Sequence, residues 1–355
     1  MSSQKADHKA ELAADTQSIR KEYKRGVKIR FVFPIVMLVL CACSLVVDIM
    51  TGPAMLSWNE VLACLFQLGE VPVNTQVVVL GMRLPIALMA LVVGCALGSS
   101  GAVMQTILVN PLASPYTLGV GAGAAFGASI AIVVGLGSVG TSSLAFLFSM
   151  LICLLIYWMG RQRGMAANSM VLSGIALLFL FQALQALVQY GSSETQNQAI
   201  VFWSFGSLQK TTWLKLAITA TCTLICVPLL LKDSWKYTAL LLGDEKAESL
   251  GVKVGRVKLR AFLLISLISA TAVCFTGTIG FVGLAGPHIA RMVVGEDQRS
   301  YIVSSAICGM TILSVASIIS KVIIPGIIYP IGIITSIIGV PFFFVLVMRQ
   351  KGGAR

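Results

Sequence analysis

The sequence has little charge. Asp, Glu, Lys and Arg make up 11% of its 355 residues, whereas a soluble domain carries about 25%. From Leu84 to Gly160 there is no charged residue, a run of 77 positions. Hydrophobic residues make up 57%, and the mean hydropathy is +0.91. No packed core requires that much apolar surface, so the composition excludes a soluble globular protein and indicates an all-α, polytopic membrane protein.

Histidine is almost absent, and the cysteines lack the spacing of metal sites. The only histidines are His8 and His288, and the nine cysteines form no Cys-x-x-Cys pair. Most of the cysteines fall in apolar runs, where Cys packs as a small hydrophobic residue. The sequence therefore predicts no metal site and no disulfide framework.

The chain also lacks the loop Gly-x4-Gly-Lys-Ser/Thr that holds nucleotide phosphates. It shows no nucleophile paired with a base and no pair of buried carboxylates, so we predict no catalytic residues and no enzymatic activity. The net charge of +12 is not spread among aromatic residues but collects between the apolar runs, which argues against nucleic-acid binding.

Ten stretches have about the length of a membrane-crossing helix. The stretch 279–295 is short and contains glycine and proline, yet charge supports it. With ten crossings and the N-terminus inside, 22 of the 26 Lys and Arg lie on the cytoplasmic side, as the positive-inside rule predicts. The four cations left outside are Arg83, Lys210, Lys215 and Lys321. The predicted spans are 31–50, 85–107, 113–136, 141–160, 168–190, 213–231, 261–276, 279–295, 301–320 and 331–348.

Both ends of the chain are predicted to lie in the cytoplasm. Residues 1–30 hold eight Lys or Arg, four Asp or Glu and no apolar run. They are too long and too mixed in charge for the basic region of a signal peptide. We expect a cytoplasmic tail over 1–30, partly helical or disordered, a transmembrane domain over 31–349, and a second tail over 350–355.

Helix breakers stand in the middle of the uncharged run. Asn110, Pro111 and Pro115 end one span, and a glycine-rich helix follows. In lipid, a broken helix must face protein or a water-filled cavity, and such breaks often mark a transport site. An ordinary tight turn explains the same residues equally well. These residues alone indicate a transporter or channel.

Four segments, in this order, resemble the FecCD family, the permease subunits of binding-protein-dependent ABC importers for iron-siderophores, haem and cobalamin. The resemblance covers about residues 31–349 and implies ten spans per subunit. The segments are "RLPIALMALVVGCALGSSGAVMQTILVNPLASPYTLGVGAGAAFG" (83–127), "FWSFGSL" (202–208), "LGDEKAESLGVKVGRVKLR" (242–260), and "GTIGFVGLAGPHIARMVVGEDQR" (277–299) with "PIGIITSIIGVPFFF" (330–344).

The resemblance implies import of an iron(III)-siderophore complex across the bacterial cytoplasmic membrane by ATP-driven alternating access, with haem or cobalamin as alternatives. The implied partners are two ATPase subunits that bind ATP and Mg, a periplasmic or lipid-anchored substrate-binding protein, and a second permease, copy or paralogue. This chain would hold no cofactor. An ion-coupled secondary transporter is the alternative from another class. It would need ionisable residues at mid-membrane, and the spans hold almost none apart from Asp48 and Arg291 near their ends.

The loop over 237–255 mixes charged and apolar residues, which allows a short amphipathic helix. Such a helix could lie on the membrane interface. The resemblance instead favours docking into a groove of the ATPase through Asp244, Glu245, Ala247 and Gly251. Gly251 would allow the turn between two short helices.

The resemblance also places Asn110, Leu112 and Asn168 at a cytoplasmic gate, where amides near a two-fold axis could hydrogen-bond across it. Asn168 could equally be a helix N-cap.

Gln182, Gln185 and Gln189 lie three and four residues apart in the fifth span and form one polar stripe, a candidate wall of the transport cavity. Hydrogen bonds between helices of one subunit are the alternative.

Two outer cations match positions where the family meets acidic lobes of the binding protein. Arg83 opens the "RLP" motif, and Lys321 precedes Pro330 by nine residues. The family often has another arginine three residues after the first, where this chain has Ile86. An interfacial anchor that reaches to lipid headgroups is the alternative for Arg83.

Overall fold

The computed structural model describes residues 2–54, 56–66, 71–324 and 326–350. Side chains are described from Gly26 to Pro341 within these ranges, and for Phe344 and Met348 beyond them. All regular secondary structure in the described part is helical, and this part contains no strand. Most of the predicted C-terminal tail, 351–355, lies outside the described residues.

Ten of the helices match the ten predicted spans. Seven segments are long and apolar enough to cross a membrane, and three shorter apolar helices complete the set. The long segments are Gly26–Met50 of α1 (Ser2–Met50), α4 (Leu84–Ile107) with the preceding α3 (Val73–Gln76) and the π-helical η1 (Val77–Arg83), α6 (Gly137–Gln162), α7 (Ala167–Tyr190), α9 (Trp213–Lys232), α12 (Val254–Thr276) and α14 (Gln298–Val322). The shorter ones are α5 (Val120–Val134), α13 (Val282–Val294) and α15 (Ile331–Gln350). The predicted all-α membrane fold is confirmed.

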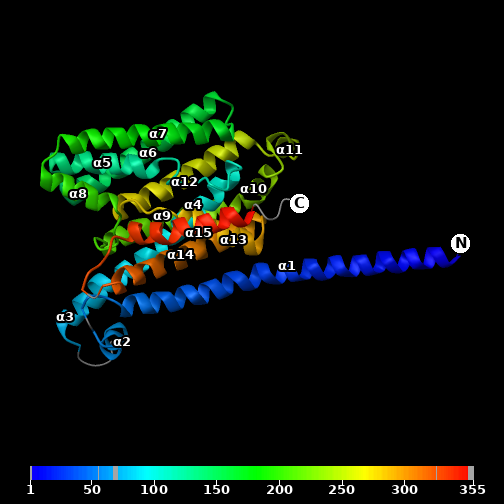
Figure 1. Cartoon of the computed structure of the whole chain (residues 1–355), viewed down its shortest axis with the longest axis horizontal. Helices are drawn as coiled ribbons and strands as arrows, with labels where there is room; N and C mark the ends of the chain where they lie inside the picture. Colours follow the sequence, from blue (N-terminus) through cyan, green and yellow to red (C-terminus); the bar gives the residue numbers. More distant parts are fainter. Residues whose placement is uncertain (1, 55, 67–70, 325, 351–355) are drawn as a thin grey trace.

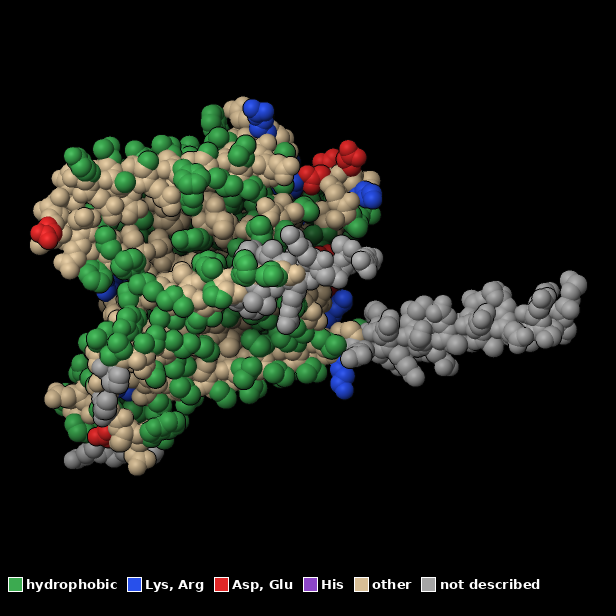
Figure 2. Space-filling model, in the orientation of Figure 1, with side chains coloured by type: hydrophobic (Ala, Val, Ile, Leu, Met, Phe, Trp, Pro, Cys, Tyr) green, Lys and Arg blue, Asp and Glu red, His purple; other side chains and the backbone are tan. Residues whose placement is uncertain are grey.

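The remaining helices are short. They are α2 (Trp58–Phe66), α8 (Glu194–Ser204), α10 (Ser234–Leu240) and α11 (Asp244–Ser249). Figure 1 shows α10 and α11 at the same end of the bundle as the C-terminus, while α2, α3 and α8 lie at the other end. Figure 2 shows apolar side chains over the flank of the bundle and charged ones near its ends, as expected for a membrane solvent.

Several boundaries differ from the prediction, among them the start of α12, which lies at Val254 rather than at 261. The third span begins at Val120 rather than at 113, because Pro111 and Pro115 hold the preceding residues in turns and Gly119 has a φ of +86°. The helix α1 begins at Ser2, so no break in the backbone separates the predicted tail from the first span.

Small residues bring α4 and α14 into direct contact. A Cβ atom on Gly98 would overlap the carbonyl oxygen of Ser305, and one on Gly309 would overlap that of Gly94. In lipid, where burial of apolar surface gives little gain, close backbone packing is a main source of helix association. The α4–α14 contact is the most extensive in the fold, and it places α4 in the interior, also packed against α9, α12 and α13.

Candidate functional site

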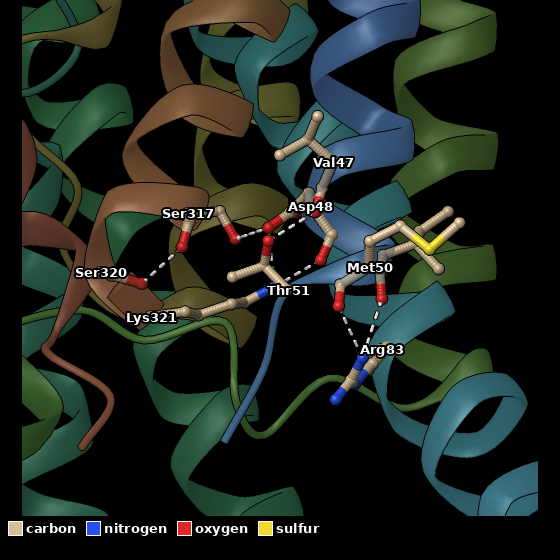
Figure 3. A network of polar contacts seen from close by, with 9 residues as sticks. Val47, Asp48, Met50, Thr51, Arg83, Ser317, Ser320 and Lys321 are labelled. Atoms are coloured by element: carbon tan, nitrogen blue, oxygen red, sulfur yellow. Dashed lines mark hydrogen bonds and ion pairs between the residues drawn. The ribbon is translucent and has the colours of Figure 1, made fainter. Parts of the chain in front are cut away.

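Both cations predicted to dock a partner bind the end of α1 within the subunit (Figure 3). Lys321 Nζ, on α14, donates to Asp48 Oδ1 at 2.7 Å and to the Asp48 carbonyl oxygen at 3.3 Å. Ser317 Oγ donates to the same carboxylate oxygen at 2.9 Å. The Lys321 and Asp48 side chains are 4% and 0% exposed. The pair therefore joins α1 to α14 inside the protein.

Arg83 binds the next carbonyls of the same turn. Its Nη1 donates to the carbonyl oxygens of Met50, at 2.9 Å, and Ile49, at 3.3 Å, and its Nη2 donates to that of Ala54. Gly52 leaves room for the guanidinium, because a Cβ there would stand 2.8 Å from Arg83 Nε. A cation at the C-terminus of a helix neutralises its unpaired carbonyls. Arg83 is buried in this arrangement, and a docking role for it stays a prediction.

The predicted coupling loop folds as α10 and α11 followed by a tight cap. The turn between these two helices contains Gly243, with a φ of +99°, rather than Gly251 as we expected. Gly251, with a φ of +83°, ends α11 instead. Its N–H donates to Glu248 O at 2.9 Å, and the Val252 N–H donates to Ala247 O at 3.0 Å. These two bonds form a Schellman motif, which stops the helix and turns the chain toward α12.

Two contacts fix α11 to the bundle and leave one face free. Ala247 is fully buried, and Asp244 Oδ2 accepts a hydrogen bond from the buried Lys258 of α12 at 2.6 Å. Glu245 and the apolar Leu250 remain exposed. The segment thus presents charged and apolar side chains at the end of the bundle, beyond the membrane-spanning helices (Figure 2).

The predicted gate residues lie in the connection before α5 and in the first turn of α7. Asn110 Oδ1 accepts from the Leu112 N–H at 2.9 Å, and the Leu112 side chain is exposed. The preceding Val109 has a φ of +45°, an unusual conformation for a β-branched residue. Asn168 is exposed in the first turn of α7, and the N-cap is Ala166 without a side-chain hydrogen bond. The alternative that Asn168 caps this helix is therefore wrong.

A buried polar network under the Asn110 turn escaped the sequence analysis. The Gln105 carbonyl oxygen accepts from the Asn110 N–H at 3.0 Å, and its side-chain oxygen accepts from the Tyr301 hydroxyl at 2.9 Å. Arg291 donates to the same hydroxyl at 3.0 Å and lies over the Tyr301 ring. The network joins α4, α13 and α14 to the turn. The only feature of the sequence that pointed to this network was Gln105, a polar residue inside the longest uncharged run.

The glutamine stripe of α7 is partly used inside the subunit. Gln185 Nε2 donates to Ser204 Oγ of α8 at 3.1 Å, which is the intrasubunit bond considered as the alternative. Gln182 is exposed and Gln189 half-buried, and a place on the transport path stays a prediction for the stripe. Within the described residues, no group of three or more His, Cys, Asp or Glu side chains is placed to hold a metal ion.

Comparison with known proteins identifies the family of this chain. Residues 37–349 match the model of the FecCD transport family. A protein of Helicobacter pylori (strain J99), named as a probable iron chelatin transport system permease, is 36% identical over 88% of this chain and 97% of its own length. The hemin transport system permease HmuU of Yersinia pestis is 35% identical over 77% of this chain and 83% of its own length.

A solved structure agrees with these matches. It is described as a metal-chelate type ABC transporter in an inward-facing conformation. It is 33% identical, covers 89% of this chain and 98% of its own, and superimposes with a TM-score of 0.80. With its ten apolar helices, the chain belongs to the FecCD transport family and is a non-catalytic, multi-pass permease subunit of an ABC importer.

Proposed function

We propose that this permease moves an iron(III)-siderophore complex inward across the bacterial cytoplasmic membrane. The observation that supports this substrate class is the likeness, over nearly the whole chain, to a permease named for iron chelatin and to a transporter described as metal-chelate type. Haem is the second candidate, since the Yersinia pestis relative is named for hemin. Cobalamin is the third, since a relative from Halobacterium salinarum is named as a cobalamin import system permease.

The proposed orientation puts both termini in the cytoplasm. It is supported by the positive-inside rule, which places the cation-rich connections at the end of α10 and α11. A helix pair at that end is available to a cytoplasmic partner. Two ATPase subunits, which bind ATP and Mg, would dock there on Glu245 and the neighbouring exposed side chains of α11.

The proposed gate lies at the same end of the bundle. In a pair of permeases, identical or paralogous, the Asn110 turns would face one another near the two-fold axis together with Leu112 and Asn168. Amides there could bond across the axis and separate at low cost. The Gln105–Tyr301 contact, which ties this turn to α14, supports a turn that is held in position rather than loose.

Binding-protein docking at Arg83 and Lys321 would require a change of partners. Both cations now bind α1, Lys321 through a carboxylate and Arg83 through carbonyls. Acidic groups of a periplasmic or lipid-anchored binding protein could replace these acceptors at the end of α1. If Arg83 and Lys321 keep their present partners, they would instead hold the end of α1 in position, and residues next to it would contact the binding protein.

Uptake of radiolabelled ferric siderophore by right-side-out vesicles tests the function. The vesicles contain permease and ATPase with ATP inside, and the binding protein is added outside. ATP-dependent uptake that resists excess haem and excess cobalamin is expected. Displacement by one competitor would replace the proposed substrate with that competitor. Without ATP-dependent uptake of any of the three, the ion-coupled alternative would have to be tested.

A further inference from the structure

Among the described residues, three of the four cations predicted to face outward have no carboxylate partner, and only one of these three, Arg83, is held by the carbonyls of another helix end. Arg83 and Lys321 bind the end of α1, whereas Lys210 and Lys215 take part in no ion pair there. Lys215 Nζ instead donates to the backbone carbonyl oxygen of Lys210 at 2.9 Å, which holds the Lys215 ammonium group beside the backbone of Lys210. Cations on the outer side run against the positive-inside rule. Two neighbouring lysines there without a carboxylate partner indicate a site for an anionic ligand.

Both lysines line one cavity of about 690 Å³ between the end of α8 and the starts of α6 and α9. Its other polar walls include the hydroxyl residues Ser138, Thr141 and Ser207, and Trp203 adds an aromatic side chain. Ammonium and hydroxyl donors are the groups that bind a phosphate, and tryptophan is typical of the headgroup level of a membrane.

A second, almost wholly apolar cavity adjoins the first. It has a volume of about 800 Å³ and lies between α6, α9 and α12. The two cavities share Ser142, Cys274 and Phe275, so they form one groove with a cationic end and an apolar body. Leu147 and Ile225 line the apolar part and are exposed, so this part opens on the flank of the bundle where apolar side chains meet lipid.

We infer that this groove binds an anionic phospholipid of the outer leaflet. The phosphate lies between Lys210 and Lys215, and an acyl chain lies along α6, α9 and α12. A ferric chelate fits less well, because the long apolar part offers few polar groups and opens sideways between helices. The choice of leaflet rests on the proposed orientation, while the binding itself does not.

The test uses the permease assembled with its ATPase in phosphatidylcholine nanodiscs. A small share of the lipid is phosphatidylglycerol with a photoreactive acyl chain, and phosphatidylcholine with the same chain serves as the neutral probe. Mass spectrometry then locates the label. Phosphatidylglycerol is expected to label peptides of α9 and α12 more than phosphatidylcholine does.

Charge and shape are separated by two variants. Lys210→Gln with Lys215→Gln should lower labelling by phosphatidylglycerol about fivefold for each lysine, to the level of phosphatidylcholine. The matched control, Arg161→Gln with Arg163→Gln, removes two exposed cations from the other end of α6 and should change nothing. Ala217 also lines the apolar part, so Ala217→Phe should fill this part and lower labelling by both lipids.

Four results would overturn the inference. Equal labelling by both lipids would remove the role of the lysines, and the absence of label in the assembled transporter would mean that another surface covers the groove. Loss of label on adding inorganic phosphate would point to a free anion. Displacement by ferric siderophore would make the groove part of the transport path. None of these readouts depends on uptake, so failure of the transport proposal would be seen separately.

Discussion

Lys321 Nζ lies 2.7 Å from Asp48 Oδ1, although 273 residues separate them in the chain, and both side chains are buried between α1 and α14. Asp48 Oδ2 has no hydrogen-bond partner, so the pair is not fully satisfied. Its Coulomb energy is largely offset by the cost of removing two charges from water. The largest loss of stability is therefore expected when only one member of the pair is removed and the other charge stays buried.

Asp48→Asn should destabilise the protein by about 3–5 kcal/mol, because it leaves the Lys321 ammonium buried without a counter-ion. Thermal unfolding of the purified protein in detergent measures this effect. The double variant Asp48→Asn with Lys321→Met should recover most of the loss. The control Glu248→Gln changes an exposed carboxylate. A single variant as stable as the parent would contradict a buried charged pair.

Gly309→Ala should separate α4 from α14 and lower the melting temperature, because the new methyl group would overlap the Gly94 carbonyl oxygen. Overpacking of this kind costs about 1–3 kcal/mol. Gly255→Ala is the matched control, since nothing lies within 4 Å of the added atom in the helix α12. That substitution should be neutral or stabilise by up to about 1 kcal/mol. Similar melting temperatures for both variants would refute the close contact.

Tyr237 should make the protein sensitive to alkali. Burial and the nearby Asp233 charge raise the pKa of its hydroxyl, against a smaller opposing effect of Arg260. The neutral form is thus favoured in the folded state, and this stability is lost as pH rises above the unfolded pKa of about 10. Tyr237→Phe should lose less melting temperature between about pH 9 and 11 than the parent protein.

The same substitution tests a second property of this side chain. The Tyr237 hydroxyl is buried without a hydrogen-bond partner, so its removal should not destabilise the protein at neutral pH. A large loss of stability at pH 7 would mean that the hydroxyl is bonded, and an unchanged alkaline slope would mean that it does not titrate.

Asn110→Ala should weaken the proposed gate. It removes the acceptor of the Leu112 N–H, a bond worth about 1 kcal/mol, or about fivefold in an opening equilibrium. Leakage of labelled chelate from loaded proteoliposomes without ATP measures the change. Asn110→Asp keeps the acceptor but puts like charges near the axis, so it should leak as well. An Asn110→Asp variant that does not leak would show that residue 110 acts only by stabilising the turn and not through contacts across the axis.

Glu245→Arg should weaken binding of the ATPase subunits by about tenfold if α11 is the docking segment, since reversing a charge in an interface replaces attraction by repulsion. Co-purification at rising salt measures the loss. Glu194→Arg is the matched control, because this exposed glutamate lies in the first turn of α8, at the opposite end of the bundle. Equal retention of the ATPase by both variants would exclude α11.

The spanning helices could be predicted because a bilayer requires about 20 apolar residues per crossing and sorts charge by side. Short helices outside lipid show neither the apolar length nor the charge asymmetry of a membrane span. The start of α8 carried a different signal, the Ser-x-x-Gln pattern of a capping box, which Ser193 and Gln196 form in the structure. The partners of Arg83 could not be found this way, because the carbonyls that it binds belong to a turn 29 to 34 residues earlier and carry no residue signature.

Alternating access requires some helices to slide past others, and the backbone contact of α4 with α14 limits where that happens. A step along this contact would drive carbonyl oxygens against Cα atoms, and no rotamer could absorb it. The contact of α5 with α6 is equally close, since a Cβ atom on Gly127 would overlap the carbonyl oxygen of Leu144. In the proposed transport cycle each of these two helix pairs would therefore move as one body, and the displacement would be taken up between the pairs.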